Sequence, residues 1–479
     1  MSGRVGAEGL SNRFARLSAL DLMFLRVESE AWPCHFGGLA VLDGGALVDP
    51  SGRLRLGEIV DRLSRRLAML PQLRRRVLFP GPLRGRPLWV DDAGFDLQRH
   101  VFETEVEPPG GDGELLDKAA ELCGSMLDRS RPLWELWFLT GLAEGRVGAL
   151  LKLHHAVADG LAAVALMASL FDAGQGDREQ GWTVWEPEPL PTGASLLVDG
   201  LSTKVRGIAR AAAGLAHPIS HAREFRLKAG VARRILSPAR APRTSLNRRV
   251  GAGRVVRFLC LDLTAVKDVA HGCGCKVNDV VLDVWTGGLR QLLVSRGEQV
   301  AQLEPVTTVP ASLRSAKDAG AGGNELGAMS VPLPVWEPDV ERRLSLIVSR
   351  TRQAKAEQQS VAVMNFLAAL SRTPLGRYFA AHQHAANVEV TNVIGPPVPV
   401  RLFGAPVLAI LPIVEPVGNM GPILCAFSYA GQLFLVVTAD AHGFPDLEVL
   451  IAGMESDARA LLTASTTRRP DGARKRLAN

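Results

Sequence analysis

Apolar and polar positions follow two blocks along the chain, and each block mixes strand patterns with helix patterns. In the first block, apolar runs over 38–42 and 147–153 predict strands, and the spacing over 56–70 predicts a helix. In the second block, alternation over 255–259 predicts a strand. Further elements of this block are helices over 264–271, 279–294, 340–356 and 447–462, and a strand pair at 425–428 and 433–438. Asn278 is the expected N-cap of the helix over 279–294. The pattern predicts an α/β protein built from two similar halves.

The length of the chain supports this division, because 479 residues exceed what one core usually serves. We expect a first half over 1–182, a crossover linker over 183–253, a second half over 254–465 and a disordered basic tail over 466–479. Prolines mark the start of the linker as irregular, and helical spacing over 196–236 predicts one or two basic helices that cross between the halves.

Composition narrows the setting of the protein. With 47% hydrophobic and 22% charged residues the chain is of ordinary globular type, and no apolar run approaches the ~20 residues of a membrane-spanning helix. The first twenty residues have no secretory pattern, so we expect a cytoplasmic protein with reduced thiols. Cys273 and Cys275 lie close together, but no second pair of ligands follows at zinc spacing. We therefore expect no metal.

Positive charge is concentrated in one segment. From Lys204 to Arg254 the chain carries thirteen basic residues and only one acidic residue, Glu224. Apolar residues between them could form the buried face of a helix lying on an anionic lipid surface. A solvated linker and a site for the phosphates of coenzyme A remain alternatives. Nucleic acid is not expected, because no binding motif or aromatic platform accompanies the charge.

The run His154-His155-Ala156-Val157-Ala158-Asp159-Gly160 carries the chemistry. It lies where the strand over 147–153 turns into an apolar helix, and such turns present side chains to clefts. Imidazole, with a pKa near ~6.5, suits removal of a proton from a hydroxyl group. Neighbours on an extended segment point in opposite directions. We therefore predict His155 as the base, His154 as a scaffold residue, Asp159 as a helix-start residue that fixes the turn, and Gly160 as room for substrate or close packing.

Other chemistries fit this sequence less well. A metal site at His154, His155 and Asp159 has no further ligand at helical spacing. A serine hydrolase needs a Gly-x-Ser-x-Gly elbow, which the chain does not contain. The glycine-rich run over 320–323 is not followed by the Lys-Ser or Lys-Thr of a phosphate loop.

Together with Pro132-Leu133-Trp134 and Asn278-Asp279-Val280-Val281-Leu282, the motif resembles the bacterial wax ester synthase/acyl-CoA:diacylglycerol acyltransferase family, actinobacterial triacylglycerol synthase type. Blocks at 309–314 and 323–324 match as well, so the resemblance spans about residues 16 to 465. The family's Ser-Asn-Val-Pro-Gly-Pro appears here as Thr391-Asn392-Val393-Ile394-Gly395-Pro396, and its Leu-Ser-Pro as Leu17-Ser18-Ala19. Both departures bear on substrate preference.

The resemblance implies two chloramphenicol-acetyltransferase-like halves with a tunnel between them and His155 at its middle. It implies direct attack of diacylglycerol or a long-chain alcohol on acyl-CoA, with no cofactor, metal or covalent enzyme intermediate. Contact with membranes or lipid droplets would follow from such substrates. Asp279 is expected at a helix start and in the scaffold. Trp134 is expected in the core, although by the same resemblance its element flanks the tunnel. Thr391 supports its motif, and Asn278 and Asn392 either donate to the oxyanion or hold their loops.

Two competing functions share these motifs. The first is an acyltransferase of the polyketide-associated or condensation type, whose acyl donor is bound to a carrier protein. The second is a non-catalytic, lipid-binding homologue.

Overall fold

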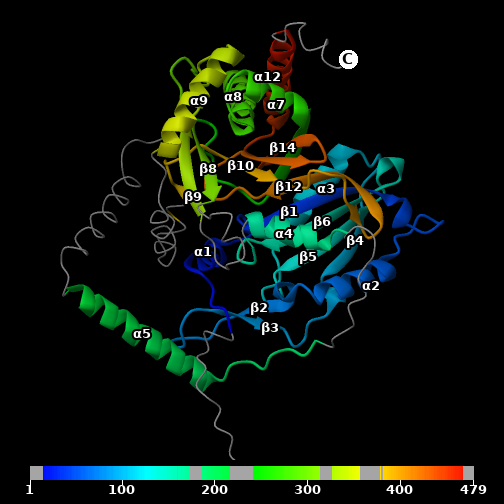
Figure 1. Ribbon diagram of the computed structural model, residues 1–479, viewed down its shortest axis with the longest axis vertical. Coiled ribbons are helices and arrows are strands. Elements are labelled where there is room, and N and C mark those ends of the chain that lie inside the picture. Colours follow the sequence, from blue (N-terminus) through cyan, green and yellow to red (C-terminus); the bar gives the residue numbers. More distant parts are fainter. Residues whose placement is uncertain are drawn as a thin grey trace, which may run out of the picture.

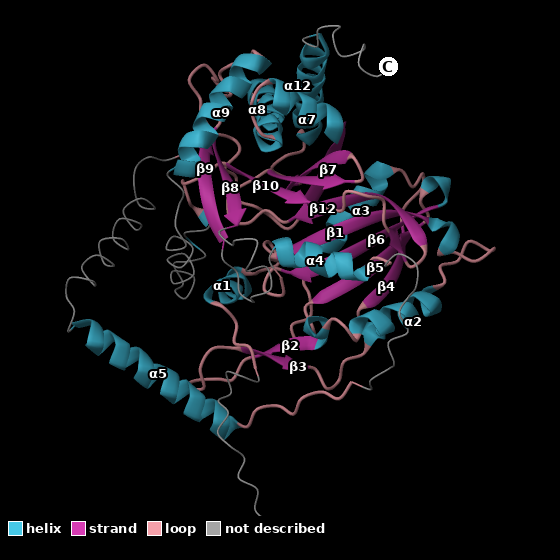
Figure 2. Ribbon diagram, in the orientation of Figure 1, coloured by secondary structure: helices cyan, strands magenta, loops and turns pink. Residues whose placement is uncertain are grey.

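The computed structural model describes residues 14–158, 160–172, 185–215, 241–312, 326–356, 378 and 381–467. Two six-stranded sheets dominate it, one in each half (Figures 1 and 2). This confirms the predicted α/β architecture. None of the helices in these ranges is long and apolar enough to cross a membrane.

The first sheet has the strand order β11-β12-β1-β6-β5-β4. Its strands are β1 (His35–Asp43), β4 (Val101–Glu105), β5 (Trp134–Thr140), β6 (Arg146–His154), β11 (Arg401–Leu402) and β12 (Ala405–Val414). The helices of this half are α1 (Ala19–Val27), α2 (Leu56–Leu67), α3 (Asp112–Gly124) and α4 (Gly160–Leu170), and a hairpin is formed by β2 (Arg75–Leu78) and β3 (Leu88–Asp91). Two of the six strands therefore come from the range predicted as the second half.

The second sheet has the order β7-β14-β13-β10-β8-β9. Its strands are β7 (Arg254–Asp262), β8 (Val306–Ser312), β9 (Leu326–Pro332), β10 (Val388–Ile394), β13 (Ile423–Tyr429) and β14 (Gln432–Asp440). Four helices, α7 (Leu263–Gly272), α8 (Val277–Ser295), α9 (Val340–Ala356) and α12 (Leu447–Thr467), lie together above it in Figure 1. Buried residues of these helices and of one face of the sheet form one apolar cluster.

The opposite face of the second sheet packs onto the first half. Phe427, Phe434 and Val436 belong to the same buried cluster as Leu39 and Leu150 of the first sheet. Strand residues alternate between the two faces of a sheet, so β13 and β14 supply both cores at once. The two halves thus share a hydrophobic core.

Helix α5 (Gly193–Leu215) projects from the body of the molecule (Figure 1). Asp199 pairs with Arg16, Leu196 is buried in the first half, and the hairpin loop lies against Gly200. A Cβ at Gly200 would lie 2.2 Å from the carbonyl oxygen of Leu83, so this contact needs glycine. The predicted basic helix is confirmed over this range, and its described contacts are with the first half. The remainder of the 196–236 prediction lies outside the described residues.

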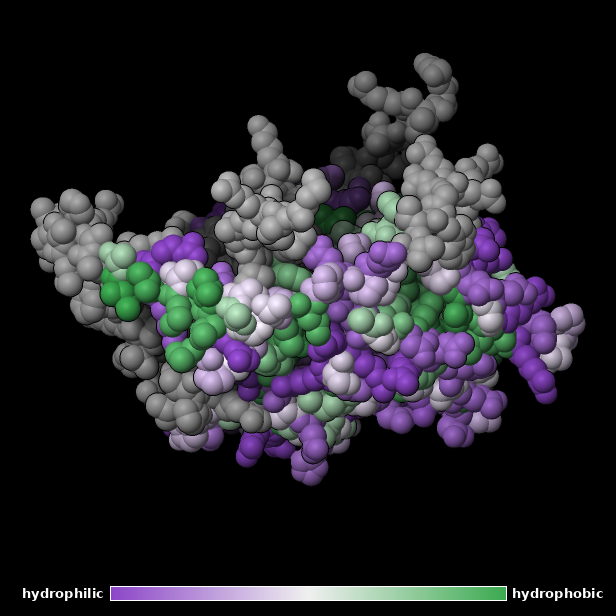
Figure 3. Space-filling view, turned by 90° about the horizontal axis from the view of Figure 1, so that it is seen from below, coloured by the Kyte–Doolittle hydropathy of each residue, from purple (hydrophilic) through white to green (hydrophobic). Residues whose placement is uncertain are grey.

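Helix α5 also carries a stripe of apolar side chains that are exposed to solvent. Val198, Val205 and Ile208 are 68%, 64% and 70% exposed. With Leu201 they follow the spacing of a single helical face. Apolar surface is visible over this helix in the view of Figure 3.

Two predicted helix boundaries need correction. Helix α8 begins at Val277 with Lys276 as its N-cap, so Asn278 lies inside the first turn and is not the cap. The N–H of Lys276 donates to the Asp279 carboxylate at 2.9 Å, and this bond sets the helix start. Helix α12 extends to Thr467, into the range predicted as the tail. The rest of that tail lies outside the described residues.

One ion pair links the halves at the core. Arg254 of β7 pairs with Glu415 just after β12, and neither side chain is exposed. Arg254 also donates to the carbonyl of Ala31 in the first half at 2.7 Å. Buried pairs of this kind make their partners mutually dependent, because either one alone would be an uncompensated buried charge.

Glu415→Gln should lower the free energy of unfolding by roughly 3 kcal/mol, because Arg254 would remain buried without its counter-charge. Denaturant unfolding measures the change. Glu448→Gln is the control: it removes a partner of Arg257, on the same strand, but Glu448 is 68% exposed. The control should cost less than about 1 kcal/mol. Equal losses in the two variants would contradict the role given to Glu415.

Candidate active site

The His-His motif is positioned by the two strands that flank β6. His154 is the last residue of β6 and pairs with His35 of β1, while the N–H of His154 donates to the Leu133 carbonyl at 3.1 Å. The next N–H, that of His155, donates to the Cys34 carbonyl at 3.0 Å. Both histidines are thus held through their backbone before any side chain is considered.

His154 is completely buried and its ring closes the turn. Its Nδ1 accepts from the N–H of Ala156 at 2.9 Å, so a neutral ring carries its proton on Nε2. That nitrogen lies 3.5 Å from Oε1 of Glu28. Burial and the charge of Arg129 lower the pKa of His154 to about 3. The inward scaffold position predicted for His154 is where the structure places it.

His155 is partly exposed and lies between two aromatic rings. Phe24 of α1 stacks on it with centroids 4.8 Å apart and planes 19° apart, and Phe36 of β1 lies 5.0 Å away at 51°. Burial, followed by the charges of His154 and His35, lowers the pKa of His155 to about 3. The ring is therefore neutral near pH 7 and can accept a proton. Its role as a base stays a prediction.

A buried cluster of Glu28, His35 and His154 lies behind the motif. Nε2 of His35 is 3.3 Å from Oε1 of Glu28, whose other oxygen pairs with Arg129. One donor atom from each of the three residues lies within 4.8 Å of the others, so the set could hold a metal ion. The sequence pattern gave no indication of this cluster.

Trp134 belongs to the core of the first half. Its Nε1 donates to the Leu73 carbonyl at 2.7 Å, and its ring stacks on His100 with centroids 4.5 Å apart. It also pairs with Leu153, the residue before the motif. Trp134 therefore supports the motif strand from within the core.

The side chains of Asn278 and Asn392 hydrogen bond to each other in the second half. The side-chain amide of Asn392 on β10 donates to that of Asn278 on α8 at 3.4 Å. Within the described ranges neither of them hydrogen bonds to His155. Asp279 is buried and accepts from Thr351 at 2.7 Å, and Thr391 is half-buried on β10. A role for either asparagine at the oxyanion stays a prediction.

The remaining residues of the motif lie at the start of α4. Gly160 is the first residue of that helix, and Asp159 lies outside the described residues. The predicted function of Asp159 in fixing the turn stays a prediction.

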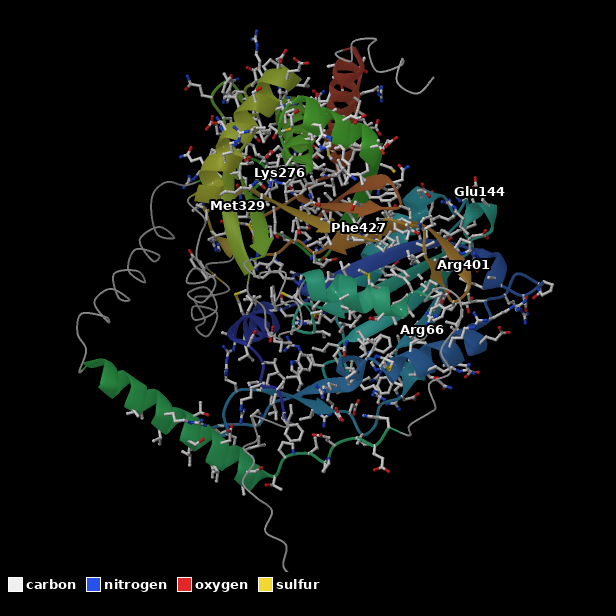
Figure 4. The ribbon with its side chains drawn as sticks, in the orientation of Figure 1. Arg66, Glu144, Lys276, Met329, Arg401 and Phe427 are labelled. Carbon is white, nitrogen blue, oxygen red and sulfur yellow. The ribbon has the colours of Figure 1, made fainter. Side chains whose placement is uncertain are left out.

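A small apolar cavity lies between α4 and the first sheet. Met167 of α4 packs against Gly38 of β1, where a Cβ would lie 2.4 Å from the Met167 sulfur. Phe427, labelled in Figure 4, borders a second, smaller cavity beside it. His155 lines neither cavity. The predicted tunnel stays a prediction.

Comparison with known proteins gives the family. The model of the wax ester synthase/diacylglycerol acyltransferase catalytic domain matches residues 17–281, and that of the C-terminal domain of the same family matches residues 322–461. The probable diacylglycerol O-acyltransferase tgs1 of Mycobacterium tuberculosis is 31% identical over 95% of this chain and 96% of its own. The corresponding tgs2 is 29% identical over 92% and 97%.

Solved structures confirm the fold. The wax ester synthase/diacylglycerol acyltransferase from Marinobacter aquaeolei VT8 matches with a TM-score of 0.65 at 22% identity, over 94% of this chain and all of that one. A starter condensation domain of rhizomide synthetase matches with a TM-score of 0.56 at 12% identity, over 96% and 97%. The predicted fold of two chloramphenicol-acetyltransferase-like halves is thereby confirmed.

The lowered pKa values of the two motif histidines predict a loss of stability in acid. His154 and His155 have a pKa of about 3 in the folded protein, far below the ~6.5 of an unfolded chain. Below pH ~6.5 the unfolded state binds protons that the folded state does not, so stability falls as pH drops toward 3. The slope should reach about 1.4 kcal/mol per pH unit for each group.

Urea unfolding at pH 7, 6 and 5 measures this slope. His154→Gln should flatten it, because one titrating group is removed, and the exposed His442→Gln should not. An unchanged slope in His154→Gln would show that His154 is not held neutral by burial.

Proposed function

The chain belongs to the wax ester synthase/diacylglycerol acyltransferase family, and we propose that it moves a long-chain acyl group from acyl-CoA onto diacylglycerol, with long-chain alcohols as further acceptors. The names of its relatives support diacylglycerol as the acceptor. One observation supports the mechanism: His155 is a neutral imidazole, held by backbone and aromatic contacts, with part of its surface exposed.

The reaction then needs one base and no covalent enzyme intermediate. His155 removes the hydroxyl proton of the acceptor as the oxygen attacks the thioester carbonyl carbon. The tetrahedral oxyanion collapses, the carbon–sulfur bond breaks, and protonated His155 returns its proton to the leaving thiolate of coenzyme A. Burial lowers the pKa of His155, so the imidazole carries no proton before the reaction.

The other motif residues have supporting roles in this proposal. Asn278 and Asn392 bind each other and so hold α8 against β10, while Asp279 fixes the start of α8. Trp134 supports β6 from the core. Gly160 leaves room where the acceptor approaches. Asp159 fixes the turn.

His155→Ala should abolish transfer of radiolabelled palmitate from palmitoyl-CoA to dioleoylglycerol or hexadecanol. A general base contributes roughly 10²- to 10⁴-fold, so a tenth of wild-type turnover or more would contradict the assignment. The melting temperature should change little, because His155 keeps part of its surface in solvent. His442→Ala is an exposed control that should retain activity. Transfer from a carrier-bound donor but not from palmitoyl-CoA would favour a condensation-type enzyme.

We also propose that the enzyme works at the surface of membranes or lipid droplets, on the cytoplasmic side. Its acceptor would reside there, and the stripe of Val198, Leu201, Val205 and Ile208 on α5 offers apolar surface to it. Lys204 and Arg206, both exposed on the same helix, add attraction of about 1 kcal/mol each near anionic lipid. Most of the basic residues predicted for this contact lie beyond the described part of α5.

Val205→Ser with Ile208→Ser should reduce sedimentation with anionic liposomes several-fold, because both side chains belong to the proposed lipid face. Activity on detergent-dispersed substrate should remain. Met69→Ser is the matched control, since Met69 is as exposed as Ile208 but lies beyond α2. Undiminished liposome binding in the double variant would exclude α5 as the contact. A raised KM for acyl-CoA would instead indicate that this region binds coenzyme A.

A further inference from the structure

The cluster of Glu28, His35 and His154 is buried and only partly hydrogen bonded. Oε1 of Glu28 and Nε2 of His154 are buried atoms without a hydrogen-bond partner, while the ring of His35 faces the backbone of Cys123 and Ser125. Yet the carboxylate lies within 3.5 Å of both imidazoles. Leaving a buried carboxylate oxygen and a buried imidazole nitrogen unsatisfied is costly. The position of the cluster indicates a function.

Each residue of the cluster comes from an element that also holds His155. Helix α1 carries Glu28 directly after its last turn, and one turn earlier it carries Phe24, which stacks on His155. The N–H of Glu28 donates to the Phe24 carbonyl at 3.0 Å, so the two residues are rigidly related.

The two strands repeat this arrangement. On β1, His35 lies between Cys34, whose carbonyl accepts from the N–H of His155, and Phe36, whose ring packs on His155. On β6, His154 precedes His155. The buried cluster therefore links α1, β1 and β6, and these same three elements also hold the partly exposed imidazole of His155.

From this geometry we propose that Glu28, with His35 and His154, positions the catalytic imidazole, and that Glu28 acts as an ionised carboxylate held in place by Arg129. The inference rests on His155 as the base. Glu28 does not touch substrate. It fixes the separation between α1 and the end of β6, and so the space between Phe24 and Phe36 in which His155 lies.

The protonation state of His154 decides whether the cluster keeps this geometry. Protonation of His154 would place a hydrogen on Nδ1 and break the bond from Ala156 that closes the turn. The groups that face the cluster are Glu28 and Asp21 from α1, Arg129 from the loop before β5, His35 from β1, and Lys152, His154 and His155 from β6 and its turn. Arg129 opposes protonation of His154, and Glu28 orients the neutral ring.

Glu28→Gln tests the proposal. It should lower kcat about tenfold or more, because small displacements of a catalytic group are costly, and leave the KM for palmitoyl-CoA within twofold. Asp283→Asn is the matched control: it replaces a carboxyl group that is equally buried and that pairs with Arg343 in the helical layer of the second half. The control should lower the melting temperature and keep kcat. If both variants lose stability and Glu28→Gln keeps kcat, the cluster is structural and the proposal fails.

A second variant covers a Glu28→Gln protein that does not fold. Arg129 is 40% exposed, so Arg129→Gln should fold, and its loss should move the acidic limb of the kcat profile to higher pH. An unmoved limb would overturn the proposal. Stoichiometric metal in dialysed wild-type protein, measured by elemental analysis, would also overturn it by assigning the cluster as a metal centre. If His155→Ala itself retains turnover, the base assignment fails, whereas loss of activity in that variant with an inert Glu28→Gln rejects only the positioning role.

Discussion

The antiparallel pairing of β1 with β6 is the contact on which the site depends. It brings His35 opposite His154 and leaves the Cys34 carbonyl to accept the N–H of His155. A shift of one residue in this register would turn every side chain to the other face of the sheet. Gly37 and Gly38 on β1 allow this pairing to coexist with close cover from α3 and α4, since a Cβ at either would collide with Cys123 or Met167.

The two adjacent histidines show how one turn separates two environments. His154 faces a closed polar cluster, and His155 faces two aromatic rings and retains some exposure. Both rings are kept neutral mainly by burial. The neutral ring of His154 accepts the hydrogen bond that closes the turn, and the neutral ring of His155 is available for proton transfer. The two histidines could exchange roles only if the end of β6 presented its opposite face to the core.

Much of this could be predicted from the chain. The inward position of His154 followed from strand alternation, and the helix over 340–356 from apolar spacing. The start of α8 was placed wrongly at Asn278, because capping preference alone does not show that Asp279 bonds back to Lys276. Glu28, His35 and Arg129 could not have been found, since they converge only after α1, β1 and β6 are assembled. Their one local signal, charged or polar residues among apolar neighbours, is common at strand ends.

Strands β11 and β12 belong to the first sheet although they come from the C-terminal part of the chain. This limits how the enzyme can be divided into fragments or recombined with relatives. Strand β12 covers the edge of β1, although about 220 residues of sequence lie between the start of the linker and the chain's return to this sheet at β11. The far end of β12 leads into Glu415, which pairs with Arg254. A fragment ending at the linker would expose β1 as a long apolar edge open to aggregation. A chimera that takes its C-terminal portion from a relative would also replace β12, the strand that pairs with β1. Recombination at the linker therefore changes both halves at once. Substrate specificity cannot be moved between relatives by exchanging one half.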